Sequence, residues 1–315
     1  MPSKLSIFDL KSDWLKDDIY VHGLKDEIKE ITRLLGGPGK LSKRLEVNYN
    51  SCFREWTNGR TPVPLAKLER MISFCNANTA TIIKSRISDR QCIISCRYSP
   101  HKMLFPSSIS EDLSYLAGLI LGDGSLAGDS SNARGNWNIT ALFDDINHQK
   151  MCDELIKKEF QISPKNHKDE SECWLSVFSS KTTQWFWRSF FEMHNGYKAS
   201  KISFPKIILD SPNNNFRIAL LQGLFDSDGS ITKRKSVQYA STSKIIVDQV
   251  SAQLSALGIV HSKAVWIKDK KYLPLYSIAI RRKSSVLSFA HQIGFRHPRK
   301  ASILNRIALS SSGQG

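Results

Sequence analysis

The sequence predicts an α+β protein in which one helix-and-strand unit is present twice in tandem, behind a small α-helical domain. The first observation is an internal repeat, because LAGLILGDGSL (116–126) recurs as LQGLFDSDGSI (221–231). The second is that strand-like and helical stretches follow both copies in the same order. The third is a series of short helical patterns between residues 24 and 75. We therefore expect tandem pseudo-twofold αββαββα repeats with antiparallel sheets.

Residues 1–78 are expected to form the helical domain. LKDEIKEITRLLG (24–36) has helical periodicity and stops at Gly36-Gly37-Pro38. Asn48 is suited to cap a later helix, and Asn58-Gly59 is suited to end it. The helices expected after the first one cover residues 39–46, 49–57 and 64–75.

This domain resembles a known DNA-binding module. The segment after Glu55, WTNGRTPVP, is similar to the W-x-N-G-R-x-x-P segment that follows the recognition helix of repressor-like helix-turn-helix domains. The resemblance implies that Asn50, Ser51 and Arg54 face DNA. Because residues 46–49 lack the glycine expected in the turn, a helical scaffold without DNA contacts remains the alternative.

Residues 79–110 are expected to be a short strand pair and a linker. TIIKSRIS and QCIISCRYS, within 81–99, have the character of strands. PHKMLFPSSISED (100–112) holds two prolines and a serine cluster, which are typical of a linker. The first repeat is then expected over 111–210 and the second over 211–315.

The two repeats match beyond their first helices. Each continues with a strand, a helix, a second strand region and a basic, hydroxyl-rich helix start, and each closes with a Lys-Ala-Ser segment, at Lys198 and Lys300. The matched strands are 134–143 with 234–242 and 172–178 with 275–280, and the matched helices are 146–160 with 244–258. This order is what predicts the αββαββα unit.

Each motif helix ends at an acid, Asp123 or Asp228, although the C-terminal end of a helix is already negative. Gly118 and Gly122 share one helix face, and small residues hold the same positions in the second copy, so the two helices can pack closely. The acids then converge, and a hard divalent cation would relieve their repulsion. A core helix followed by a turn explains one copy equally well, but two copies in register favour a metal site.

The charge of the chain indicates a polyanionic partner. The 45 basic and 29 acidic residues give a net charge of +16, and residues 211–315 alone hold 16 basic and 4 acidic residues. Because no apolar run is long enough to span a membrane and the N-terminus is no signal peptide, nucleic acid is the expected partner and no membrane is. A solvated basic surface is the alternative.

The six cysteines form no CxxC pair, and nothing indicates secretion, so disulfides and structural zinc are not expected. We expect a reduced, intracellular protein. The compartment would be the cytoplasm of a prokaryote, or an organelle or the nucleus of a eukaryote.

Strand alternation divides the first strand of each repeat into an inner and an outer face. Trp137, Ile139 and Ala141 are expected to face the core, as are Val237 and Tyr239. Arginine, asparagine and glutamine on the outer faces could read purine edges in the major groove, although a solvated face is the alternative. The outward residues are Arg134, Asn136, Asn138 and Thr140 in the first repeat and Arg234, Ser236 and Gln238 in the second.

Both motifs resemble the LAGLIDADG dodecapeptide of homing endonucleases, and the first departs from it at Leu121. The flanking segments KISFPKIILDSP and YASTSK resemble endonuclease domains found within inteins, and the resemblance covers roughly 111–309. An N-terminal splicing block and a terminal His-Asn pair are not found, so a free-standing enzyme is expected rather than an intact intein.

The resemblance implies a monomeric pseudo-dimer that cuts both strands of specific double-stranded DNA sites with Mg²⁺ or Mn²⁺. Asp123 and Asp228 match the metal-binding acids, and the carbonyls of Gly122 and Ser227 match backbone positions that reach the ions. Lys181 and Lys283 match the basic residues near the scissile phosphates. Arg281 and Arg282 compete for this role, and a generic phosphate contact is the alternative for all four.

Two other functions stay open at this stage. One is a DNA-binding transcriptional regulator with a retired nuclease domain, which the intact acid pair disfavours. The other is an RNA maturase that assists intron splicing, a role known in this family, which would make an intron RNA a partner.

Overall fold

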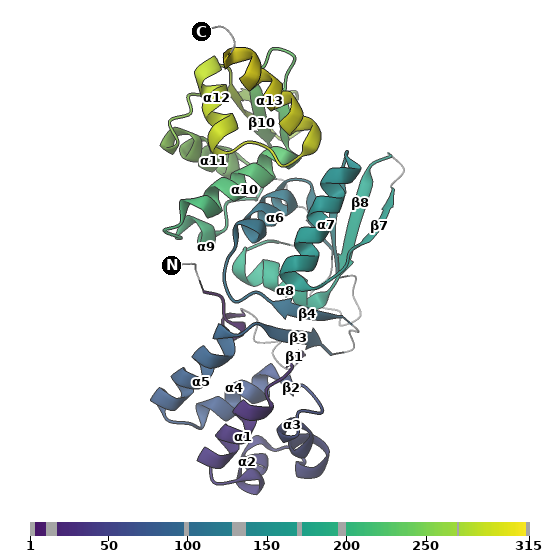
Figure 1. Ribbon diagram of the computed structural model, residues 1–315, viewed down its shortest axis with the longest axis vertical. Helices are drawn as coiled ribbons and strands as arrows, with labels where there is room; N and C mark the ends of the chain where they lie inside the picture. Colours follow the sequence, from purple (N-terminus) through teal and green to yellow (C-terminus); the bar gives the residue numbers. More distant parts are fainter. Residues whose placement is uncertain are drawn as a thin grey trace.

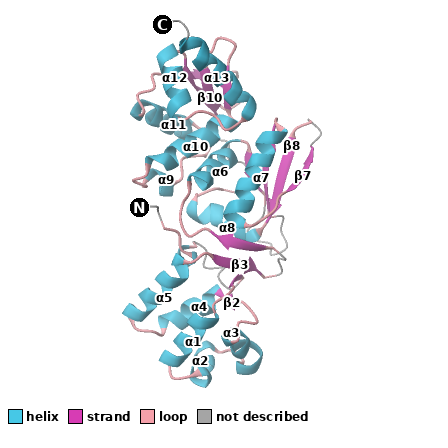
Figure 2. Ribbon diagram, viewed as in Figure 1, coloured by secondary structure: helices cyan, strands magenta, loops and turns pink. Residues whose placement is uncertain are grey.

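Three four-stranded antiparallel sheets, one in each part of the chain, organise the described residues of the computed structural model. The structure describes residues 4–10, 18–97, 101–127, 137–168, 172–194, 200–269 and 271–312. The N-terminal unit, the first repeat and the second repeat follow one another along the long axis of the molecule (Figure 1). Helices cover the sheets of all three parts (Figure 2). No helix among the described residues is long and apolar enough to cross a bilayer.

The N-terminal unit combines short helices with a sheet whose strand order is β2-β1-β3-β4. Its helical elements are η1 (Ile7–Asp9), α1 (Lys25–Leu34), α2 (Pro38–Leu45), the π-helical turn η2 (Tyr49–Phe53), α3 (Arg54–Thr57), α4 (Leu65–Ser73) and α5 (Ala77–Asp89). Its strands are β1 (Ile19–Val21), β2 (Val63–Pro64), β3 (Cys92–Cys96) and β4 (Lys102–Phe105). The helices lie close to the expected positions, but the helix-turn-helix assignment stays a prediction.

Two expectations for residues 79–110 were wrong. TIIKSRIS lies inside α5 rather than in a strand, because the Asn76 side chain caps this helix by accepting from the Thr79 amide at 2.9 Å. Ile83 and Ile87 are four residues apart and buried, so the segment has one apolar helical face. The expected linker contains β4, which pairs with β3.

Each repeat contains the predicted αββαββα order, which confirms the fold class. The first repeat consists of α6 (Glu111–Gly122), β5 (Gly124–Leu126), β6 (Asn138–Phe143), α7 (Ile146–Phe160), β7 (Lys165–Lys168), β8 (Trp174–Ser179) and α8 (Lys181–Phe190). After α9 (Lys206–Leu209), the second consists of α10 (Asn214–Ser227), β9 (Gly229–Ile231), β10 (Val237–Ser241), α11 (Lys244–Ala256), β11 (Ser262–Trp266), β12 (Leu275–Ile280), α12 (Lys283–Gln292) and α13 (Pro298–Ser312). The sheet orders β5-β6-β8-β7 and β9-β10-β12-β11 are equivalent.

The two repeats meet where α6 packs against α10, side by side at the centre of the molecule (Figure 1). Ser110 caps α6 by accepting from the Leu113 amide, and Asn213 caps α10 by accepting from the Asn215 amide. Because both helices are apolar and buried along most of their length, they form the core between the repeats. Their capped starts and their shared crossing fix where their C-terminal ends lie.

The N-terminal sheet packs on the first repeat. Strands β3 and β4 contact α8 and α7. The Phe105 ring on β4 meets the edges of Phe186 and Phe190 on α8, with ring centroids 5.8 Å apart in both pairs. Aromatic burial of this kind joins the first hundred residues to the repeats through a hydrophobic interface.

Candidate metal and nucleic-acid site

The acids Asp123 and Asp228 are the C-terminal capping residues of α6 and α10. The two helix ends approach so closely that a Cβ built on Gly122 would lie 2.0 Å from Ser227 Oγ and 3.2 Å from Asp228 Oδ2. Gly124 and Gly229 open the short strands that follow, and a Cβ on either would collide with the preceding helix. The structure therefore places both motif ends at one point between the repeats.

Lys300, in the first turn of α13, lies at this same point. Its Nζ donates to the carbonyl oxygens of Phe225, Asp226 and Ser227 at 3.2, 2.6 and 3.2 Å. Burial lowers the pKa of the ammonium group, while the nearby carboxylates, Asp123 and Asp228 among them, act in the opposite direction. A cation thus compensates the negative end of α10 and its terminal acid.

Lys300 is a site residue that sequence reasoning did not assign. The available signal was the Lys-Ala-Ser segment that closes both repeats. Its counterpart Lys198 lies outside the described residues.

A cavity of about 320 Å³ opens beside the helix ends. Carboxylates, a lysine and a histidine gather in it, together with apolar residues of the first sheet. The lining residues are Leu119, Asp123, Leu142, Phe143, Asp144, His148, Cys173, Asp226, Ser227 and Lys300. This concave space adjoins Asp123 and the C-terminal end of α10.

A buried polar network supports one wall of this cavity. Asp226 Oδ2 accepts from the Tyr115 hydroxyl at 2.7 Å, and the same hydroxyl lies 2.8 Å from His148 Nε2. Burial lowers the pKa of His148 to about 3, with the charges of His297 and Lys300 acting in the same direction, so this imidazole is neutral. Burial also raises the pKa of Asp226, although the hydrogen bonds that it accepts oppose the shift.

The donors at the helix ends fit a hard divalent cation. Two carboxylates, on Asp123 and Asp228, and the backbone carbonyls of Gly122 and Ser227 offer oxygen ligands, the type that Mg²⁺ and Mn²⁺ prefer. Within the part of the chain that the structure describes, no three histidine, cysteine, aspartate or glutamate side chains form a metal-binding group. A cation here would therefore depend on carbonyls, water and phosphate oxygens in addition to the two acids.

The predicted basic residues lie in different environments. Lys181 is buried, pairs with Asp18 at 3.2 Å and lies over the rings of Trp137 and Trp185 at about 5 Å. Lys181 thus lies between Asp18 of the N-terminal unit and two tryptophans of the first repeat. The other three are exposed at the junction of β12 and α12, where Arg281 donates to Ser262 Oγ at 2.8 Å, Arg282 occupies the position before α12 and Lys283 is its first residue. Phosphate contact by these four residues stays a prediction.

The outer sheet faces largely follow the expected alternation. Ile139, Ala141, Val237 and Tyr239 are buried, whereas Asn138, Thr140 and Gln238 are partly exposed. Ser236 was expected to point outward, but it is only 5% exposed. It precedes β10, and its hydroxyl bonds Thr232 Oγ1 at 2.7 Å within the β9–β10 turn, so strand alternation does not apply to it.

The remaining predicted DNA contacts are either exposed or outside the described residues. Arg234 is exposed in the β9–β10 turn, and Asn50 and Arg54 are exposed on η2 and α3. Arg134 and Asn136 lie outside the described residues, as does the side chain of Ser51.

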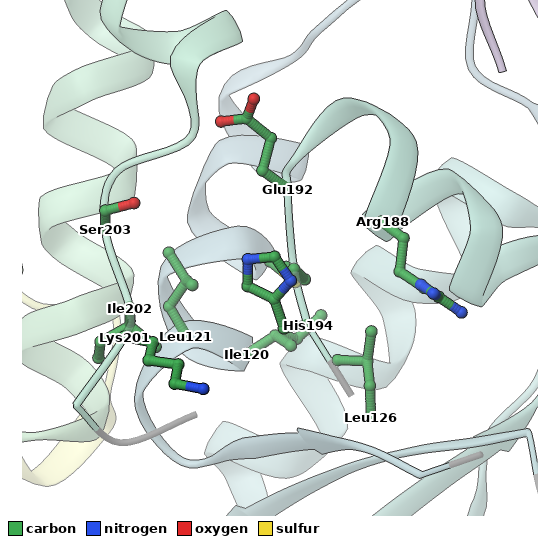
Figure 3. A pocket seen from close by; sticks show the side chains of 10 residues that line it. Ile120, Leu121, Leu126, Arg188, Glu192, His194, Lys201, Ile202 and Ser203 are labelled. Carbon is green, nitrogen blue, oxygen red and sulfur yellow. The ribbon is translucent and has the colours of Figure 1, made fainter. Parts of the chain in front are cut away.

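A second cavity, of about 340 Å³, is lined by residues from α6, from the end of α8 and from the segment 201–203 (Figure 3). The His194 ring points into it, and Leu121 and Ile120 form part of its apolar wall. Neither Asp123 nor Asp228 lines it, so it is separate from the site at the helix ends.

Comparison with known proteins finds a family match within the second repeat. Residues 215–294 match the family model of a LAGLIDADG-like domain. The chain is 26% identical over 245 residues to a DNA polymerase of Thermococcus hydrothermalis and 28% identical over 206 residues to a replication factor C small subunit of Methanocaldococcus jannaschii. These matches cover 75% and 64% of this chain but only 14% and 10% of those relatives.

Two solved structures resemble parts of the chain. The homing endonuclease I-DmoI in complex with DNA and Mn is 20% identical, with a TM-score of 0.45 over 58% of this chain and 96% of that one. Full-length DUF199/WhiA from Thermatoga maritima is 16% identical, with a TM-score of 0.43 over 64% of this chain and 60% of that one.

Proposed function

We propose, because the chain carries a LAGLIDADG-like domain over residues 215–294, that it is a sequence-specific, divalent-metal-dependent endonuclease for double-stranded DNA. The observation that carries this proposal is the convergence of two helix ends, with Asp123, Asp228 and Lys300 at one point beside a cavity. Such an arrangement places oxygen ligands for a cation beside a positively charged side chain.

The chemistry assigns a role to each of these residues. Asp123 and Asp228, with the carbonyls of Gly122 and Ser227, would hold Mg²⁺ or Mn²⁺. A bound ion would supply charge that stabilises the attacking water and the leaving oxygen. Lys300 would add positive charge at the scissile phosphate, where negative charge develops in the transition state.

The sheets and the basic surface would hold the DNA. Asn138, Thr140 and Gln238 occupy outer sheet faces and could contact base edges, while Arg281, Arg282 and Lys283 could contact phosphates. The N-terminal unit would add contacts through Asn50 and Arg54 to flanking DNA. Because both repeats lie in one chain, a monomer would contain both halves of the site.

The matches to the DNA polymerase and the replication factor C small subunit are consistent with a mobile domain. These two relatives have unrelated names, and this chain spans 14% and 10% of their lengths. A domain carried within larger proteins would give this pattern. We infer that the activity serves the homing of an intron or a similar element rather than DNA replication.

The test is selection of cleaved sites from a randomised DNA library incubated with Mg²⁺ or Mn²⁺. The proposal expects one enriched site cut on both strands, and no cutting when a chelator removes the metal. Specific binding without cleavage in either metal would contradict it and favour a transcriptional regulator. Splicing of a host intron that depends on the protein would favour an RNA maturase.

A further inference from the structure

The segment 296–300 is held by contacts that reach across the interface between the repeats. Asp226 Oδ2 accepts from the backbone amides of Arg296 at 2.9 Å and His297 at 3.1 Å. Asp144, which belongs to the first repeat, accepts from His297 Nε2 at 2.7 Å and Arg299 Nη2 at 2.5 Å. The segment that carries Lys300 is therefore anchored at three positions, 296, 297 and 299.

The charges of this cluster favour its formation. The hydrogen bond from His297, together with the charges of His297 and Arg299, lowers the pKa of Asp144 although burial opposes it. Arg296 extends the cluster, because Nη1 donates to Asp112 Oδ1 at 2.8 Å and the guanidinium lies 4.3 Å from the Tyr115 ring centroid. Charge-assisted hydrogen bonds of this kind are stronger than neutral ones.

The first repeat lacks the matching chemistry. In the motif alignment Leu121 stands where Asp226 stands in the second copy, and it has no hydrogen-bonding side chain. Gly124 pairs with Ala141 in the first repeat, and the equivalent Gly229 pairs with Tyr239 in the second. Asp144 lies three residues after Ala141, so its counterpart is Thr242, which lies three residues after Tyr239 and carries no charge. Of the two pairs of equivalent positions, 121 with 226 and 144 with 242, only Asp226 and Asp144 therefore carry a carboxylate, and both contact the Lys300 segment.

We propose that Asp144 and Asp226 are positioning residues that clamp segment 296–300, set Lys300 beside the acid pair and so assist the cleavage of one DNA strand more than the other. We call this group, Asp144, Asp226, Arg296, His297 and Arg299, the Lys300 clamp. The strand preference rests on the proposed endonuclease function, whereas the holding of the segment does not.

The experiment uses the full chain with Asp144→Ala, a half-exposed position at which truncation leaves the core intact. Asp248→Ala is the matched control, because Asp248 is similarly exposed and accepts from two cations, Lys244 at 2.5 Å and Lys263 at 3.0 Å, on α11 and β11. Asp144→Glu is the conservative variant that should restore the clamp.

The first measurement is amide hydrogen exchange without metal or DNA. Residues 296–301 should exchange faster in Asp144→Ala than in the wild type, and at the wild-type rate in Asp248→Ala. Unchanged exchange in Asp144→Ala would overturn the clamp, whether or not the protein is a nuclease. If the wild type cuts no DNA, the endonuclease proposal fails and exchange still decides whether the segment is clamped.

The second measurement follows each strand of a target duplex labelled at one end. Asp144→Ala should bind like the wild type and cut one strand about 10- to 100-fold more slowly, with nicked duplex accumulating, and Asp144→Glu should recover most of the rate. Equal slowing of both strands would overturn the strand preference. Normal cutting of both strands, despite faster exchange, would show that the clamp does not position Lys300.

Discussion

Gly118 and Gly223 lie against each other where α6 crosses α10. A Cβ built on Gly118 would lie 3.0 Å from the Gly223 Cα and 2.3 Å from the Leu220 carbonyl oxygen, and one on Gly223 would lie 2.2 Å from the Tyr115 carbonyl oxygen. Since each glycine meets main-chain atoms of the other helix, a methyl group fits only if the helices separate. The position of both terminal acids depends on this contact.

Gly118→Ala should destabilise the protein by about 1–3 kcal/mol, as overpacking in a dense core does. The measurement is urea unfolding of the metal-free chain. Gly39→Ala is the control, because a Cβ there meets nothing within 4 Å and its backbone is helical, so its stability should be unchanged or higher. Wild-type stability of Gly118→Ala would show that the helices do not pack as described.

Asp123→Asn or Asp228→Asn alone should abolish cleavage of both strands, because the converging helix ends would provide one shared metal site. DNA binding should survive, since the sheets and the basic residues are unchanged. Supercoiled plasmid in Mg²⁺ separates the products, and Asp269→Asn, in the β11–β12 loop, is the control. Clean nicking by each mutant would instead indicate two separable sites.

Lys300→Met should lower the cleavage rate by about 10²- to 10³-fold, the usual effect of removing one group that stabilises transition-state charge. Lys283→Met should have a much smaller effect, because Lys283 is exposed at the start of α12. Single-turnover cleavage at saturating protein separates this loss from weaker binding. The reverse order of effects would place the basic group at the end of β12.

Low pH should destabilise the fold, because the buried His148 side chain is neutral in the folded state. Its pKa is about 3 in the folded chain and about 6.5 in the unfolded chain, so the unfolded state binds the extra proton between these values. Stability is therefore fully present above pH 6.5 and falls as pH drops towards 3, by at most about 1.4 kcal/mol for each unit. Urea unfolding from pH 7 to pH 4 should show a shallower decline for His148→Gln than for the wild type.

DNA binding should weaken steeply with salt. The net charge of +16 indicates that much of the affinity comes from phosphate contacts and released counterions. A plot of log affinity against log salt should have a negative slope of about 0.9 for each phosphate neutralised. Removing Arg281 should reduce that slope, and a flat plot for the wild type would contradict nucleic-acid binding.

The repeats could be predicted because their signals are local. The paired Gly-x-x-x-small faces and the acids after them lie within two short stretches, so the α6–α10 crossing and the convergence of the helix ends followed from the sequence. The N-terminal sheet could not be found this way. Its strands β1 and β2 contain three and two residues, too few to show alternation, and β1 pairs with β2 and β3, which are both distant from it in the sequence.

The features that sequence reasoning missed have separate physical causes. Residues Ala77–Asp89 form a capped helix despite their strand-like composition, because the buried isoleucines are spaced for a helix. Lys300 is 72 residues after Asp228 and contacts the end of α10 only in the folded chain, so sequence spacing could not place it. Ser236 lies in a turn and bonds Thr232 there, and hydrophobic periodicity gives no signal for such a hydrogen bond.

The two repeats are joined in one chain, and their corresponding positions have already diverged, as Leu121 differs from Asp226 and Thr242 from Asp144. In an assembly of identical subunits, every substitution is made twice and both halves change together. Here each substitution is made once, so one outer sheet face can alter while the other is preserved. A surface built from two different halves does not require a palindromic target. The specificity of one half can change while that of the other half stays the same.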